Sequence, residues 1–110
     1  MERAKKLKIV QGNTYEGIEV ILKDEDGQLI EGRFCEKVEF MFNGLRKMYP
    51  DEVTYDSEKG VFVVPFTQEE TFSMHEPLKY QARPYFIGGG VKGTKVYQTS
   101  VEESLSKEVL

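Results

Sequence analysis

The sequence predicts an all-β fold in which two antiparallel sheets pack face to face as a sandwich. Three observations carry this prediction. Apolar residues recur at every second position in short runs along the chain, and that period is typical of half-buried strands. Residues that favour tight turns separate these runs. Phe and Tyr make up 12% of the chain, and their rings favour strands and can fill the space between two sheets.

Seven strands are predicted, and each follows from its own pattern. In the first, Leu7 and Ile9 alternate with Lys6 and Lys8. The fifth is a continuous apolar run that only Pro65 interrupts. The last is rich in Thr. Each alternating strand is expected to place one face on the core and the other toward water. The predicted strands lie at residues 7–10, 18–23, 37–42, 53–55, 61–66, 80–86 and 91–101.

Turn chemistry occupies the breaks between the runs. Glycines and short polar side chains are concentrated there, at 12–13, 24–27, 43–44, 56–60 and 88–90. Asp24 and Asp26 also resemble the opening of a calcium-binding loop, but Gln28-Leu29-Ile30 follows, and a calcium loop needs further oxygen ligands there. The sequence therefore favours a turn. Gly88-Gly89-Gly90 is interpreted as a hairpin tip, because no Lys-Ser/Thr pair follows it as in a phosphate-binding loop.

One short helical turn is predicted near residues 67–72. The segment Thr67-Gln68-Glu69-Glu70 has the pattern of a capping box, in which the Thr hydroxyl accepts from the Glu amide and the Glu side chain reaches back. Phe66 and Phe72 flank the turn. We expect it to cross from one sheet to the other between the fifth and sixth strands.

These elements favour an immunoglobulin-like antiparallel β-sandwich of about seven strands. The Cys–Trp–Cys core of antibody domains is absent, but aromatic and β-branched packing can replace it. A flattened barrel of six or seven strands is the alternative. Residues 1–101 are expected to form one sandwich domain. Residues 102–110 show no alternation and are expected to form a tail, either a short helix or a flexible end.

Charge and hydropathy argue against nucleic-acid and membrane partners. The net charge is −4, whereas a binder of phosphate backbones needs clustered cations. The basic cluster Arg3, Lys5, Lys6 and Lys8 is interpreted as the solvated flank of the first strand. No apolar run approaches the ~20 residues of a membrane span, and the N-terminus lacks the apolar stretch of a signal peptide. We expect the chain to stay in the cytoplasm unless it leaves inside an assembly.

The residues that usually carry chemistry do not form a recognisable constellation. Cys35 is the single cysteine and His75 the single histidine, so an internal disulfide and a cysteine-based zinc site are excluded and a reducing compartment fits. A Cys35–His75 pair oriented by Glu76 lacks an activating motif. The carboxylate pairs at 69–70 and 102–103 lie in polar runs and are interpreted as solvated charge. We predict no catalytic, cofactor-binding or metal-binding residue, and no enzyme.

Contact surfaces are the remaining route to function. Four apolar or aromatic residues fall on the nominally polar faces of their predicted strands, and residues of these types are favoured at interfaces. The alternative is that the face assignment is displaced by one residue, or that a loop covers them. Arg83, Tyr85 and Tyr97 could form a weak aromatic stacking surface for single-stranded nucleic acid. The negative net charge argues against such binding. The candidate interface residues are Ile21, Met41, Tyr85 and Tyr97, with Leu105 and Leu110 in the tail.

Several segments together resemble a known family. The opening Ile9-Val10-Gln11-Gly12-Asn13-Thr14-Tyr15, followed by a strand that ends in Asp24-Glu25-Asp26-Gly27, resembles the start of the N-terminal domain of phage baseplate upper proteins. The segments 64–71 and 80–83 are similar to the second half of small prophage proteins from Gram-positive bacteria, and 104–110 is similar to their C-terminal ending.

The resemblance implies a non-enzymatic bacteriophage or prophage structural protein, either a virion accessory, a connector or a baseplate-type part. Its expected partners are other phage structural proteins and further copies of itself, and its expected location is the host cytoplasm during assembly and then the virion. Because baseplate upper proteins continue into a linker and a platform domain, a free-standing part is expected rather than a tail-fibre attachment protein. The alternatives are a non-viral β-sandwich that binds protein or carbohydrate, and an enzyme.

Overall fold

The computed structural model describes residues 8–94 and 96–110, and it confirms the all-β fold in that part of the chain. The described residues form three sheets, with the strand orders β2-β6-β5, β4-β3-β7-β8 and β1-β9. The elements are β1 (Ile9–Val10), β2 (Tyr15–Val20), the 3-10 helix η1 (Gly32–Phe34), β3 (Cys35–Phe42), β4 (Leu45–Tyr49), β5 (Thr54–Asp56), β6 (Val61–Phe66), α1 (Gln68–Phe72), β7 (Leu78–Phe86), β8 (Tyr97–Thr99) and β9 (Val101–Glu102).

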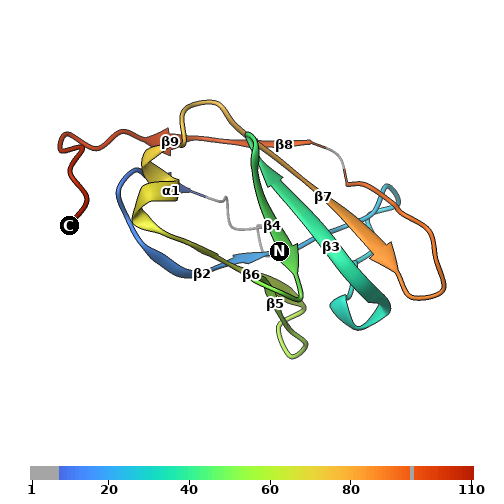
Figure 1. The fold of residues 1–110 in the computed structure, drawn as a ribbon. Helices are drawn as coiled ribbons and strands as arrows, with labels where there is room; N and C mark the ends of the chain where they lie inside the picture. Colours follow the sequence, from blue (N-terminus) through green and yellow to red (C-terminus); the bar gives the residue numbers. More distant parts are fainter. Residues whose placement is uncertain (1–7, 95) are drawn as a thin grey trace.

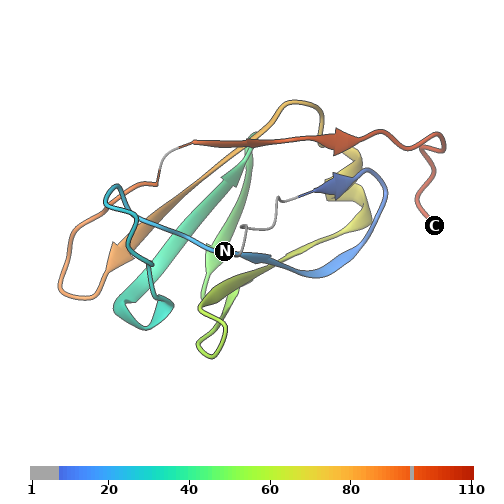
Figure 2. The ribbon, with the colours of Figure 1, turned by 180° about the vertical axis from the view of Figure 1, so that it is seen from behind.

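The strand order is that of an immunoglobulin-like sandwich, as the sequence predicts. The three-stranded sheet β2-β6-β5 corresponds to strands B, E and D of that fold, and the four-stranded sheet β4-β3-β7-β8 corresponds to C′, C, F and G. The short β1 pairs in parallel with β9. Helix α1 and the C-terminus lie at one end of the sandwich, while η1 and the β7–β8 connection lie at the other (Figure 1). Figure 2 shows the same arrangement from behind.

Aromatic rings join the two sheets in the core. Phe40 of β3 meets Phe62 of β6 edge to face, with ring centroids 5.5 Å apart. Phe42 meets Phe66 in the same way at 5.0 Å. All four rings are almost completely buried, and each such ring removes roughly 150–250 Å² from water. These edge-to-face pairs occupy the interior that a disulfide and a Trp fill in antibody domains.

The predicted turns form with the backbone that their residues favour. Asn43 and Gly44 have φ values of 45° and 96°, as the type I′ hairpin turn between β3 and β4 requires. In the 24–27 turn, Gly27 donates to the Asp24 carbonyl at 3.0 Å. The Asp24 carboxylate accepts from the amides of Asp26 and Gln28, both at 2.9 Å. That carboxylate is therefore occupied by its own turn, which confirms the interpretation of this segment as a turn.

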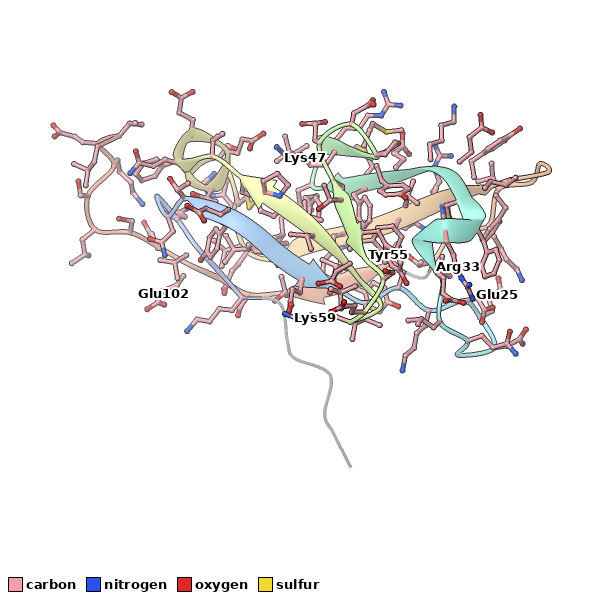
Figure 3. All side chains as sticks on the ribbon, turned by 90° about the horizontal axis from the view of Figure 1, so that it is seen from below. Glu25, Arg33, Lys47, Tyr55, Lys59 and Glu102 are labelled. Carbon is pink, nitrogen blue, oxygen red and sulfur yellow. The ribbon has the colours of Figure 1, made fainter. Side chains whose placement is uncertain are left out.

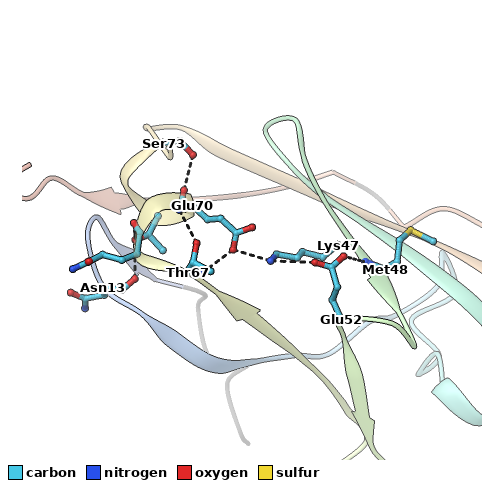
Figure 4. A network of polar contacts seen from close by, with 9 residues as sticks. Asn13, Lys47, Met48, Glu52, Thr67, Glu70 and Ser73 are labelled. Carbon is cyan, nitrogen blue, oxygen red and sulfur yellow. Dashed lines mark hydrogen bonds and ion pairs between the residues drawn. The ribbon is translucent and has the colours of Figure 1, made fainter. Parts of the chain in front are cut away.

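Helix α1 begins with the predicted capping box. The Thr67 hydroxyl accepts from the Glu70 amide at 3.1 Å, and the Glu70 carboxylate accepts from the Thr67 amide at 2.9 Å. The same carboxylate oxygen accepts a hydrogen bond from Lys47 Nζ of β4 at 2.8 Å. Glu52 is a second, longer partner of that amine at 3.6 Å. Glu70 therefore ties the helix between the sheets to the edge strand β4 (Figure 4).

Strand β4 is absent from the sequence-based prediction, and its pattern explains why. The register places Lys47 opposite Phe40 of β3, a core-facing position, and only 6% of the Lys47 side chain is exposed. A charged residue at the inward position hides the period of two. An inward-pointing charge is also one way in which edge strands avoid pairing with another chain.

The first and last predicted strands also differ from the structure. Leu7 and Lys6 lie outside the described residues, and β1 begins at Ile9. The predicted strand 91–101 is instead a single bridge between Val91 and Tyr85 followed by the short β8 and β9. The 88–90 glycines do form the hairpin tip, with Phe86 donating to the Gly90 carbonyl at 3.0 Å.

The predicted tail does not form a helix. Strand β9 includes Glu102, and residues 103–110 contain no helix or strand. The buried Gln11 side chain holds the start of this segment, since its Oε1 accepts from the Ser104 amide at 3.3 Å and from Lys107 Nζ at 2.9 Å. The Leu110 amide donates to Gln68 of α1 at 2.8 Å.

Removal of the Lys47 amine is expected to destabilise the fold. Lys47→Ala leaves Glu70 partly buried without its cation and opens space beside Phe66, whose ring lies 5.7 Å from Nζ. We expect a loss of about 1–3 kcal/mol in the free energy of unfolding, below the cost for a fully buried pair because Glu70 is 23% exposed. Urea unfolding of the native chain and the variant measures this loss. The matched control Lys59→Ala breaks an exposed pair with Glu19 and should cost less than about 0.5 kcal/mol. Equal losses in the two variants would contradict the account.

The same carboxylate predicts a pH dependence of stability. Burial by itself raises the pKa of Glu70, but hydrogen bonds from Lys47 and Thr67 outweigh it and lower that pKa below its usual value. A lowered folded-state pKa adds stability that is present above the unfolded pKa and is lost as the pH falls through the folded one. In chemical unfolding between about pH 7 and pH 3, Glu70→Gln should therefore remove part of the acid-side loss. If the free energy of unfolding of Glu70→Gln falls with decreasing pH as steeply as that of the native chain, Glu70 does not cause the loss of stability in acid.

Candidate protein-binding face

The outward side of the four-stranded sheet is the candidate binding surface, which we call the outer face. Antiparallel pairing places cross-strand partners on the same side of a sheet, and the register of β3 with β4 and β7 defines the rows. Alternation along β7 adds Lys79 to the same side. The rows are Met48–Glu39–Arg83, Arg46–Met41–Gln81 and Lys37–Tyr85–Val91.

Glu39 holds two guanidinium groups at the centre of the outer face. Arg83 donates to Glu39 Oε1 at 2.8 Å, and Arg46 Nε lies 3.1 Å from Oε2. The carboxylate side chain is 18% exposed, whereas the two arginine side chains are 58% and 60% exposed. A guanidinium carries five N–H donors, so each arginine is fixed in place and still presents donors outward. Arginine in such an arrangement is suited to carboxylates.

Apolar and aromatic side chains lie among these charges. Met41 has Arg46 and Gln81 as its cross-strand neighbours. Lys37 Nζ lies over the Tyr85 ring, 5.5 Å from its centroid. Val91, which pairs with Tyr85, is 58% exposed. Tyr, Met and Arg are the residue types enriched at the centres of protein–protein interfaces. The outer face therefore has the composition of a protein-binding surface.

The charge of the outer face is opposite to that of the whole chain. The paired rows and Lys79 supply four cationic side chains and a single carboxylate, Glu39, while the whole chain carries −4. Glu36 occupies the bulge next to Lys37 and is exposed. A cationic surface on an acidic protein attracts acidic partners and speeds their association.

The structure brings together two of the six candidate interface residues. Met41 and Tyr85 share the outer face. Tyr97 does not: it pairs with Tyr80 and stacks on it at 5.2 Å, and Tyr80 stacks on Phe42 of the core at 5.7 Å. The predicted polar-face position of Tyr97 is therefore wrong, because its pairing with Tyr80 places it on the core side of the sheet. The alternative that the face assignment had slipped was correct for this residue.

The other three candidates lie elsewhere. Ile21 is 47% exposed and directly follows β2 of the other sheet. Leu105 and Leu110 are fully exposed in the tail.

Two residues of the outer face were not predicted from the sequence. Arg46 was missed because β4 was not predicted. Glu39 was also missed, although the alternation of Val38, Glu39 and Phe40 already indicated an outward carboxylate between two core residues.

Cys35 and His75 lie at opposite ends of the sheet. Cys35 pairs with Phe86 at the end of β7, whereas His75 precedes the first residue of that strand. Nine strand residues span about 26 Å at the usual rise. Burial raises the pKa of the Cys35 thiol, and Glu76 accepts from the Val101 amide at 3.0 Å rather than facing His75. The Cys–His arrangement considered from the sequence does not form.

One shallow hollow of about 350 Å³ lies beside the β3–β4 turn, and none of its lining side chains titrates. No three His, Cys, Asp or Glu side chains among residues 8–94 and 96–110 are grouped as they would be to hold a metal ion. The hollow is lined by Phe42, Asn43, Gly44, Leu45, Ser73 and Met74.

Comparison with known proteins adds no family to this geometry. No protein-family model, no curated protein and no solved structure matched the chain. Among the described helices, none is long and apolar enough to cross a membrane.

Proposed function

We propose that this chain is a non-enzymatic structural part of a bacteriophage or prophage particle that acts by binding protein. The outer face is its docking surface. The observation that carries the binding role is the arginine pair fixed on Glu39, with distances of 2.8 and 3.1 Å, beside Met41 and Tyr85 on an open sheet. The resemblance of residues 9–15, 20–27, 64–71, 80–83 and 104–110 to phage structural proteins supports the particle as the setting.

The physical basis for binding is that little must be reorganised when a partner arrives. Strands β3 and β7 fix the backbone under every row of the outer face, and Glu39 already orders both guanidinium groups. A preorganised surface has less conformational entropy to lose on association. Met41 and Tyr85 are half-buried, so their remaining exposed surface can be covered without a change of fold.

A particle-binding measurement tests both parts of this proposal. Met41→Lys with Tyr85→Ala should lower the amount of the chain in density-gradient-purified phage particles by about tenfold or more, because loss of central interface residues costs more than ~1 kcal/mol each. Quantitative mass spectrometry of the particles gives the amount, and circular dichroism shows that the variant folds. The exposed Lys23→Ala serves as the control.

Two results would contradict the proposal. If the native chain is absent from the particles, and its gene does not lie among genes for portal, capsid or tail proteins, the viral setting is wrong. If the chain is present and the double variant is incorporated as well as Lys23→Ala, the outer face is not the docking surface.

A further inference from the structure

The outward side of the three-stranded sheet differs in character from the outer face, and we call it the acidic face. Pairing places Glu19, Val63 and Thr54 in one row, and Val61 and Asp56 in the next. An added Cβ on Gly17 would stand 2.3 Å from Val63 Cγ1, so the valine side chain lies flat over that glycine. The centre of the acidic face is therefore apolar, with Val63 half-buried against Gly17.

Carboxylates surround this apolar centre. Four exposed or half-exposed acids, Glu16, Glu19, Asp56 and Glu58, lie on β2, at the end of β5 or in the turn that follows it. The Lys59 amine lies 3.4 Å from Glu19 Oε2, and Figure 3 shows Lys59 beside the end of β2. That pair is well exposed, at 65% and 43%, and contributes little binding energy of its own. The face keeps a surplus of negative charge.

We propose that the chain assembles head to tail, with the outer face of one copy docked on the acidic face of the next copy. This inference rests on the proposed function and names the partner of its docking surface. The two faces are complementary in charge: Lys37, Arg46, Lys79 and Arg83 on one side meet Glu16, Glu19, Asp56 and Glu58 on the other. They also match in apolar content, since Met41, Tyr85 and Val91 can cover Val63 and Pro65.

The alternative of a two-fold symmetric dimer is disfavoured by charge. Outer face on outer face would place four cations against the same four cations, and like charges brought together cost several kcal/mol. Contact between two acidic faces would likewise bring carboxylates against carboxylates and cause repulsion. Head-to-tail contact is the arrangement that pairs unlike charges at both ends.

Geometry permits such an interface. The molecule measures 46 × 32 × 25 Å, and a standard interface buries about 800 Å² per partner. Both surfaces are sheet faces, which pack against one another about 10 Å apart. A contact between two different faces leaves one free face at each end, so it generates closed rings or open filaments.

A mixing experiment with two charge-reversal variants tests this arrangement. Lys37→Glu/Arg46→Glu alters the outer face and leaves the Arg83–Glu39 pair intact. Glu16→Lys/Glu19→Lys alters the acidic face. The matched controls, Lys23→Glu/Lys107→Glu and Glu103→Lys/Glu108→Lys, change the net charge by the same amounts away from both faces. Circular dichroism verifies that each variant folds.

Sedimentation velocity provides the readout. The native chain and both controls should associate with rising concentration in about 50 mM salt and dissociate in about 1 M salt, because screening shortens the range of the attraction. Each face variant alone should associate at least tenfold more weakly. An equimolar mixture of the two should recover association, because the intact outer face of one variant can meet the intact acidic face of the other.

Three results would overturn the head-to-tail inference: a native chain that stays monomeric up to about 1 mM, a mixture that recovers no association, or association that neither variant weakens. A monomeric native chain whose incorporation into particles still depends on Met41 and Tyr85 would remove this inference and leave the proposed function in place. An absence from particles would remove the proposed function alone, since self-association is measured with purified protein.

Discussion

The register between β3 and β7 is the constraint on which both the core and the candidate surface depend. Seven residue pairs, from Cys35 with Phe86 to Phe42 with Tyr80, join these two strands. Because side chains alternate, this one register turns Phe40 inward and Glu39 outward. A slip of a single residue would bury Glu39 and expose Phe40, so the burial of the aromatic core and the order of the outer face are set by the same pairing.

The Lys47–Glu70 contact extends this constraint to the periphery of the fold. It joins β4, the edge strand beside β3, to α1, the helix through which the chain passes from one sheet to the other. One carboxylate thus serves as the helix cap and as the partner of a buried amine. The position of β4 matters for function, because β4 supplies Arg46 to the outer face.

Sequence patterns predict the parts of this molecule that local chemistry determines. The turn at 24–27 and the capping box at Thr67 each depend on residues within a few positions of one another, and both form as predicted. The alternation of apolar and polar residues correctly predicted that Met41 and Tyr85 lie on the outward sides of their strands. It was insufficient for β4, where the inward residue is Lys47, and for Tyr97, whose side is set by its pairing with Tyr80 of β7. Tertiary pairing decides such positions, and no local pattern records it.

The central claim is tested most directly by solution NMR of the native chain. Nuclear Overhauser effects between the backbones of β3 and β7 report which residues lie opposite one another. The account predicts cross-strand contacts that pair Glu39 with Arg83 and Met41 with Gln81. Contacts that pair Glu39 with Ala82 or Pro84 instead would contradict it, because the outer face would then lose its arginine pair and the core its phenylalanine.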